Sequence, residues 1–132
     1  MNATGSVLLD TSVVVDYLRQ EDLSLLDQME QAKDLYLPLV ALGELLFGAY
    51  KSRQKEETLS QVQEFLRACI LLLPGEATAE FYGQIKANLS RKGSPIPQND
   101  IWVAAVALEH NLPLATRDAH FSKVDGLSVL AW

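Results

Sequence analysis

Ser6-Val7-Leu8-Leu9-Asp10-Thr11-Ser12, near the start of the sequence, is the stretch that decides the fold. Its apolar residues do not alternate with polar ones, which predicts a strand buried on both faces, as in parallel sheets. Ser12 is predicted to cap a helix over residues 13–19. Because open α/β sheets bind ligands at the carboxyl ends of their strands, Asp10 is predicted to face such a site. A helix-capping role for Asp10 is the alternative, and this stretch alone leaves both open.

The composition indicates one folded domain over residues 1–132. This length allows a sizeable core, and a hydrophobic content of 48% excludes a disordered chain. The net charge is −6, from 11 basic and 17 acidic residues, which argues against a general electrostatic attraction to nucleic acid. A polyanionic substrate would therefore need a local basic patch or bound metal ions.

Two further features bear on the compartment and on redox chemistry. Cys69 is the single cysteine, so no disulfide forms within the chain and zinc-type cysteine spacing is absent. Its apolar surroundings predict a small core residue. Residues 1–5 lack a basic region and a long apolar run, so we expect no signal peptide, no membrane span and a cytoplasmic protein.

Predicted strands and helices alternate along the whole chain. Besides the first strand, apolar runs predict strands at residues 35–38, 70–74, 112–116 and 127–130. Helical periodicity predicts helices at residues 23–33, 40–51, 57–69, 76–92 and 98–110, and one helical turn within 117–123. The alternation favours an α/β fold with a mostly parallel central sheet of about five strands, flanked by helices on both faces. The two helices within residues 40–69 are interpreted as an insertion or an interface.

Four carboxylates do not fit a solvated surface. Glu44 lies in a helix that is apolar nearly all round, where an unpaired carboxylate is costly or shifts its pKa. Asp10 and Asp118 each follow a predicted strand, and Asp100 lies in the first turn of a helix. Each aspartate also has an ordinary alternative role, as a helix cap, a turn cap or a favourable charge at a helix N-terminus.

Taken together, these carboxylates indicate a metal site. Strand ends and helix starts gather at one edge of a parallel sheet, and carboxylates brought together there repel one another unless a hard cation neutralises them. Mg²⁺ and Mn²⁺ prefer oxygen ligands and can activate water for phosphodiester hydrolysis. No serine–histidine or cysteine–histidine arrangement competes with this interpretation, and His110 and His120 are predicted to be structural.

Four segments carry a family resemblance. They are LLDTSVVVDYL at 8–18, LGELLFGA at 42–49, NDIWVAA at 99–105 and LATRDAHF at 114–121. In this order they resemble the motifs of PIN-domain ribonucleases of the VapC toxin type, across nearly the whole chain. Val103 stands where that family usually has Ile, and Gln98 is not the commonest residue before Asn-Asp, but neither difference removes a metal ligand.

The resemblance implies a fold, an activity and partners. It implies a PIN-like three-layer fold and an RNA-cleaving site that uses Mg²⁺ or Mn²⁺ and leaves 5′-phosphate and 3′-hydroxyl ends. It also implies a homodimer, held inactive by a cognate antitoxin that obstructs the active site. The implied acidic pocket consists of Asp10, Glu44, Asp100 and Asp118. Of these, Asp10, Asp100 and Asp118 would hold metal, with hydroxyl support from Thr11 and Thr116.

Alternatives from other classes are a catalytically silent interaction module and, less favoured, an Asp-based phosphatase or receiver domain. A phosphatase needs a second aspartate where Ser12 stands, and a receiver needs one after the third strand, where residues 73–75 have none. The apolar surface of residues 42–65 is a predicted interface. The basic residues considered for RNA contact, each expected instead to lie on a solvated face, are Lys51, Arg53, Arg91, Lys92 and Arg117.

Overall fold

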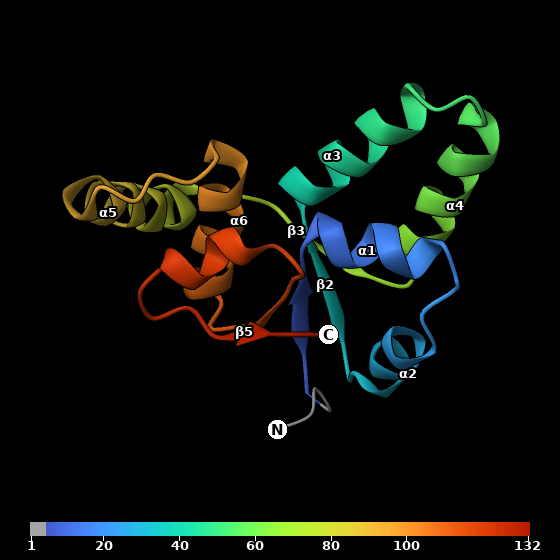
Figure 1. The fold of residues 1–132 in the computed structure, drawn as a ribbon, viewed down its shortest axis with the longest axis horizontal. Helices are drawn as coiled ribbons and strands as arrows, with labels where there is room; N and C mark the ends of the chain where they lie inside the picture. Colours follow the sequence, from blue (N-terminus) through green and yellow to red (C-terminus); the bar gives the residue numbers. More distant parts are fainter. Residues whose placement is uncertain (1–4) are drawn as a thin grey trace.

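A five-stranded sheet, in which every neighbouring pair is parallel, forms the centre of the computed structural model, which describes residues 5–132 (Figure 1). The strands are β1 (Val7–Leu9), β2 (Leu35–Pro38), β3 (Ile70–Leu72), β4 (Leu114–Ala115) and β5 (Val129–Leu130). Their order is β3-β2-β1-β4-β5. The chain runs outward from β1 to both sides, so the gap between the ends of β1 and β4 is the switch point at which such sheets bind ligands. The predicted fold class is confirmed.

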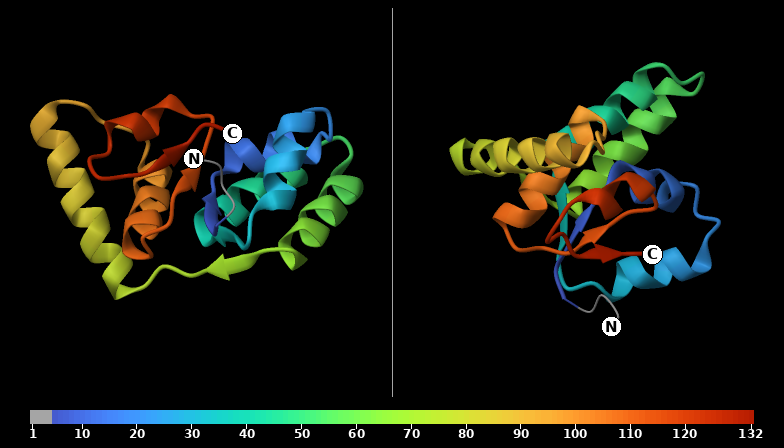
Figure 2. Two further views of the ribbon diagram at one scale, coloured as in Figure 1. Left: turned by 90° about the horizontal axis from the view of Figure 1, so that it is seen from below. Right: turned by 60° about the vertical axis from the view of Figure 1, so that its left-hand side comes forward.

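Helices cover both faces of the sheet. They are α1 (Thr11–Leu18), α2 (Leu23–Gln31), α3 (Leu39–Tyr50), α4 (Lys55–Arg67), α5 (Glu76–Lys92) and α6 (Gln98–Glu109), with the short 3₁₀ helix η1 (Ala119–Lys123). Figure 2 shows α1 to α4 on one side of the strands and α5 and α6 on the other. Each of the first three connections between strands contains two helices. The paired helices of residues 40–69 are therefore the rule in this fold, and interpreting them as an insertion is wrong.

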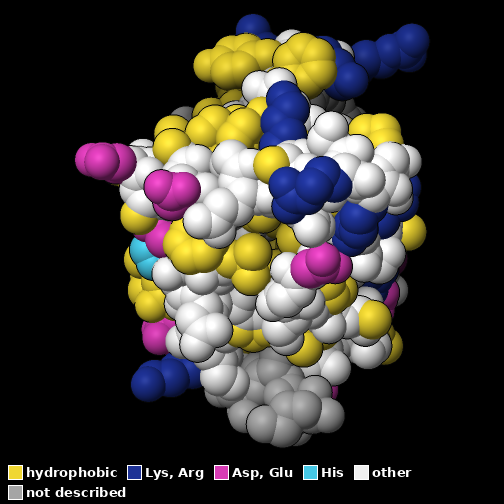
Figure 3. All heavy atoms as spheres, turned by 90° about the vertical axis from the view of Figure 1, so that its left-hand side faces the viewer, with side chains coloured by type: hydrophobic (Ala, Val, Ile, Leu, Met, Phe, Trp, Pro, Cys, Tyr) yellow, Lys and Arg dark blue, Asp and Glu magenta, His cyan; other side chains and the backbone are white. Residues whose placement is uncertain are grey.

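The end of α3 presents large apolar side chains to solvent. Phe47 and Tyr50 are 65% and 64% exposed. The Lys51 Nζ lies 4.9 Å from the centre of the Phe47 ring, and the Lys55 Nζ lies 6.0 Å from that of Tyr50. Figure 3 shows hydrophobic side chains beside lysine and arginine at the top of the molecule, where α3 ends. This exposed end lies within the predicted interface region.

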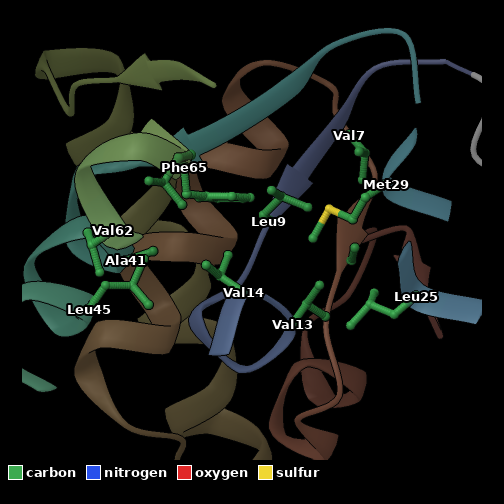
Figure 4. Close-up of a cluster of buried hydrophobic side chains, with 12 residues drawn as sticks. Val7, Leu9, Val13, Val14, Leu25, Met29, Ala41, Leu45, Val62 and Phe65 are labelled. Atoms are coloured by element: carbon green, nitrogen blue, oxygen red, sulfur yellow. The ribbon is translucent and has the colours of Figure 1, made fainter. Parts of the chain in front are cut away.

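Strand β1 connects two hydrophobic cores. Val7 and Leu9 point into the core under α1 to α4, and Leu8 points into the core formed with α5, α6 and η1. All three side chains are fully buried, which explains the run without polar alternation. Burying one such side chain contributes about 1.5–3 kcal/mol. Figure 4 shows the first core, where α1, α2, α3 and α4 converge on Val7 and Leu9.

Several predicted details change in the structure. Helix α1 begins at Thr11, so Ser12 is inside the helix and the prediction that it caps the helix is wrong. The strand predicted to be buried at 70–74 lies at the sheet edge, and Ile70 is 45% exposed. Gly93 ends α5 with φ 65°, the left-handed conformation expected there.

Cys69 is half-buried against the first core, close to its prediction, and burial raises the pKa of its thiol to about 12. Within residues 5–132, no helix combines the length and apolarity needed to cross a bilayer. The expectation that no signal peptide is present concerns residues 1–4 as well, which lie outside the described residues.

Candidate active site

The predicted carboxylates come from four segments that meet at the carboxyl edge of the sheet. Asp10 directly follows β1, and Asp118 lies three residues after β4, the neighbouring strand. Asp100 lies in the first turn of α6, as predicted, and Glu44 lies in α3, which contacts α6. The switch point therefore brings together residues more than 100 positions apart.

Asp10 is held by hydroxyl groups. Its side chain is buried, and its Oδ2 accepts hydrogen bonds from Ser12 Oγ and Thr116 Oγ1, each at 2.8 Å. The Asp118 N–H donates to Thr116 Oγ1 at 3.0 Å, and the Arg117 N–H donates to Ser12 Oγ at 3.1 Å. These bonds tie the end of β1 to the chain that follows β4.

The Asp10 side chain makes no helix-capping hydrogen bond, so the capping alternative is wrong for it, although the residue occupies the N-cap position of α1. Thr116 supports the site through a hydrogen bond that its hydroxyl group donates to the Asp10 carboxylate. Ser12 is a supporting residue that the sequence analysis missed as part of the site. Its signal was available, because a serine two positions after an aspartate can return a hydrogen bond to it.

Asp100, Asp118 and His120 form a close cluster. The His120 Nδ1 lies 3.0 Å from Asp100 Oδ2 and 3.0 Å from Asp118 Oδ1. Asp118 also caps η1, since its Oδ1 accepts the His120 N–H at 2.9 Å. The turn-capping alternative for Asp118 is therefore confirmed, and the same residue also belongs to the cluster. The placement of His120 here was not anticipated by the prediction of a structural role.

Asp100 lacks full compensation for its charge. Burial raises the pKa of this carboxyl, the nearby charges of Asp118 and Asp10 raise it further, and the hydrogen bond from His120 lowers it in part. The net effect is a raised pKa. The site thus collects carboxylates at a free-energy cost that a bound cation would remove.

Glu44 lies beside this cluster and is oriented by two donors. Thr11 Oγ1 donates to its Oε1 at 2.6 Å, and Asn99 Nδ2 donates to its Oε2 at 3.2 Å. These bonds compensate the carboxylate that the apolar α3 carries. The Thr11 hydroxyl group therefore positions Glu44. The expected contact of this hydroxyl group with water or metal is not what the structure shows. Glu44 and Asn99 line a cleft of about 490 Å³ with Phe47.

Two of the basic residues considered for RNA contact make ion pairs. The guanidinium of Arg117 donates to Asp16 Oδ2 at 3.1 Å, to Asp22 Oδ2 at 2.7 Å and to the main-chain oxygen of Trp132 at 3.0 Å. The expectation of a freely solvated side chain is wrong for Arg117. Lys92 pairs with Asp125 at 3.0 Å, while Arg53 and Arg91 are exposed as expected.

The donor set fits a divalent cation. Asp100, Asp118 and His120 are a group, among the described residues, whose ligand atoms all lie within 4.8 Å of one another. Asp10 lies outside this group of described residues, although its charge is near enough to raise the pKa of Asp100. Carboxylate oxygens are the ligands that Mg²⁺ and Mn²⁺ prefer. Glu44 does not belong to this group of described residues.

A parallel α/β sheet with a cluster of acidic side chains at its switch point defines the class of this protein. Residues 7–127 match the model of the PIN domain family. The chain belongs to that family. It is 31% identical to "Ribonuclease VapC2" of Haemophilus influenzae over 127 residues, covering 95% of this chain and 96% of that protein.

Two further similarities extend the comparison. The "tRNA(fMet)-specific endonuclease VapC" of Shigella flexneri is 30% identical over 128 residues, covering 95% of this chain and 96% of that protein. The structure of DNA-bound VapBC from Salmonella typhimurium contains a similar chain with a TM-score of 0.90 and 25% identity, covering 95% of this chain and 96% of that one. Membership of the PIN family excludes the phosphatase and receiver alternatives.

Proposed function

We propose that this chain is a metal-dependent endoribonuclease that hydrolyses RNA phosphodiester bonds and acts as the toxin of a toxin–antitoxin pair. The observation that carries the proposal is the carboxylate cluster at the switch point of a PIN domain. Relatives similar over nearly their whole length are named ribonucleases or an RNA endonuclease, which supports RNA as the substrate class. We further propose that residues 1–132 act as a single domain.

Asp10, Asp100 and Asp118 are the residues proposed to hold the cation, Mg²⁺ or Mn²⁺. When bound, the cation supplies neutralising charge and activates water for attack on phosphorus. Ser12 and Thr116 keep the Asp10 carboxylate in one orientation through their hydroxyl groups. Because water attacks, and not a ribose 2′-hydroxyl group, the expected products carry 5′-phosphate and 3′-hydroxyl ends.

Glu44 has a separate proposed role as proton acceptor for the attacking water. Both of its oxygens are fixed by neighbours, Thr11 and Asn99, and the residue lines a cleft together with Phe47. A carboxylate needs to be within hydrogen-bond reach of the proton it takes, and fixing its orientation favours that geometry. Thr11 and Asn99 are therefore positioning residues.

The proposed partner is an antitoxin protein. A groove of about 430 Å³ runs between α1, α3 and α4, is lined by Leu18, Leu45 and Val62, and reaches Glu44. A partner segment in this groove would extend to the active site and obstruct it. The similar chain from Salmonella typhimurium belongs to a VapBC structure, which supports a partner of this kind. We also propose a homodimer that uses the exposed end of α3, at Phe47 and Tyr50.

The test is cleavage of total cellular RNA by purified, partner-free protein with Mg²⁺ or Mn²⁺, followed by mapping of new 5′ ends. We expect discrete 5′-phosphate ends that require the cation and disappear with Asp100→Asn. Asp125→Asn is the matched control, because Asp125 is an exposed aspartate paired with Lys92. Absence of both cleavage and metal binding would favour the catalytically silent module. Cleavage that persists in Asp100→Asn would overturn the assignment of the site.

A further inference from the structure

We propose that His120 binds the active-site cation directly through Nδ1 and thereby favours Mn²⁺ over Mg²⁺. The inference rests on the proposed metal-dependent function and adds a nitrogen ligand to its aspartates. His120 lies in η1, two residues after Asp118, and its ring reaches Asp100 on α6.

The spacing of the three ligand atoms matches a coordination shell. The His120 Nδ1 lies 3.0 Å from one oxygen of Asp100 and 3.0 Å from one oxygen of Asp118. In an octahedral shell with ligands about 2.1 Å from the cation, adjacent ligand atoms are about 3.0 Å apart. Both distances from Nδ1 are therefore those of neighbouring ligands, and all three ligand atoms lie within 4.8 Å of one another.

The turn that carries His120 is built to hold this geometry. The His120 N–H donates to Asp118, and the following residue, Phe121, is fully buried in the core between α5, α6 and η1. These anchors fix the main chain on both sides of an imidazole that remains 45% exposed at its side chain. An ion pair at such an exposed position contributes little to folding, so stability gives no sufficient reason for this arrangement.

A nitrogen ligand has a consequence for metal preference. Mg²⁺ is satisfied best by oxygen ligands and water, whereas imidazole is a ligand of transition ions such as Fe, Ni, Cu and Zn. Mn²⁺ takes carboxylates as Mg²⁺ does, and as a transition ion it accepts an imidazole nitrogen more readily than Mg²⁺. Removing the imidazole is therefore expected to weaken Mn²⁺ binding by at least about 10-fold and Mg²⁺ binding by less.

The experiment uses Mn²⁺ alone, added to the full chain free of partner, RNA and any histidine tag. Pulsed electron paramagnetic resonance detects coupling between Mn²⁺ and a directly bonded ¹⁴N nucleus, which a merely structural histidine would not produce. We expect coupling in the wild type and in His110→Ala, the matched control, since His110 lies at the end of α6 beside Glu109. Coupling should vanish in His120→Ala and in His120→Asn. The asparagine variant keeps a polar side chain on the turn, and circular dichroism checks the fold of both variants.

Calorimetric titration with Mn²⁺ and with Mg²⁺ completes the test. Bound Mn²⁺ without nitrogen coupling, or coupling that survives in the folded His120 variants, would overturn the role of His120. Metal-dependent RNA cleavage in that case would leave the proposed function standing. A wild type that binds Mg²⁺ but no Mn²⁺ would overturn the role of His120 alone. A wild type that binds neither ion would overturn both proposals, because the ligand role depends on the metal site.

Discussion

Two groups of aspartates flank the chain that follows β4, and they differ in what neutralises them. Asp16 and Asp22 receive the guanidinium of Arg117, and this hydrogen bond holds the pKa of the Asp22 carboxyl below its usual value. Within the described part of the chain, Asp100 and Asp118 receive no arginine or lysine, and the pKa of the Asp100 carboxyl is raised, chiefly by burial. The chain thus supplies a permanent cation to one pair and leaves the other to His120 and, under the proposed function, to a bound metal ion.

This difference separates a structural ion pair from a functional one. Arg117 always carries its charge, and it links the end of β4 to α1, to the start of α2 and to the last residue of the chain. Thr116 and Asp118 flank Arg117 in the chain, and their side chains point into the acidic site. Asp16 and Asp22, through Arg117, therefore stabilise the segment that carries Thr116 and Asp118.

The largest expected effect comes from neutralising one member of each group. Asp100→Asn should lower the rate of RNA cleavage by at least about 10²-fold, because it removes a proposed metal ligand and even residues behind such ligands matter by 10–100-fold. Asp22→Asn should cleave at close to the wild-type rate, since an asparagine oxygen still accepts the hydrogen bond from Arg117. Initial rates on a mapped RNA fragment measure both.

Equal losses in these two variants would mean that both groups of aspartates serve the reaction alike, and would contradict the separate role assigned to Asp100. Asp118→Asn is the second test of the acidic site and should lower the rate of RNA cleavage as Asp100→Asn does.

The second prediction concerns the permanent cation. Arg117→Ala removes three hydrogen bonds that join separate segments, so we expect the melting temperature to fall by about 2–5 °C. Arg117→Lys should recover part of this loss, because one ammonium group cannot reach three partners in the same geometry. Calorimetry measures the melting temperatures in the absence of added metal.

If Arg117→Ala also lowers cleavage, its effect should appear mainly in kcat, through displacement of Thr116 and Asp118. An unchanged melting temperature would contradict the structural role of the arginine. The double variant of Arg117→Ala with Asp22→Asn should be no less stable than Arg117→Ala alone, because both changes break the same ion pair.

The sequence predicted the aspartates of the acidic site far better than the aspartates that bind Arg117. An apolar run ending in Asp10 and a helix with Asp100 in its first turn are local patterns, and parallel topology alone brings their ends together. The partners of Arg117 could not be found in this way, because Asp16 and Asp22 are distant in sequence and the reach of a long side chain leaves no periodic signal.

The sequence also could not predict how deeply each single strand is buried. Residues 70–72 and 7–9 are both apolar runs, but β3 lies at the edge of the sheet and β1 at its centre. Strand order depends on contacts between distant segments. The same reason explains why His120 could be placed on a turn in advance, but not against Asp100 on another helix.

The smallest effects concern folding stability without metal, where the two groups should respond with opposite sign. Asp100→Asn removes a carboxylate whose charge is disfavoured by burial and by its neighbours, so its melting temperature at neutral pH should rise by a few degrees. Asp22→Asn removes a carboxylate whose charge is favoured by Arg117, so its melting temperature should fall. Both are measured with a chelator present, and Asp125→Asn again serves as the exposed control.

The pH dependence of unfolding sharpens this contrast. The raised pKa of Asp100 means that the folded state holds its proton more tightly than the unfolded state, so the contribution of this group is lost as the pH rises from 3.8 through its folded pKa. The lowered pKa of Asp22 has the reverse effect, and its contribution is present above pH 3.8 and lost as the pH falls through its folded pKa. The stabilisation by Asp100→Asn should therefore shrink when the pH is lowered toward 4, while the destabilisation by Asp22→Asn persists at neutral pH and fades only below 3.8.

Saturating Mn²⁺ should reverse the stabilisation by Asp100→Asn, because a cation that binds the folded wild type more tightly than the variant stabilises the wild type more. A metal-free Asp100→Asn protein that is less stable than the wild type at neutral pH would show that His120 already compensates the cluster in full.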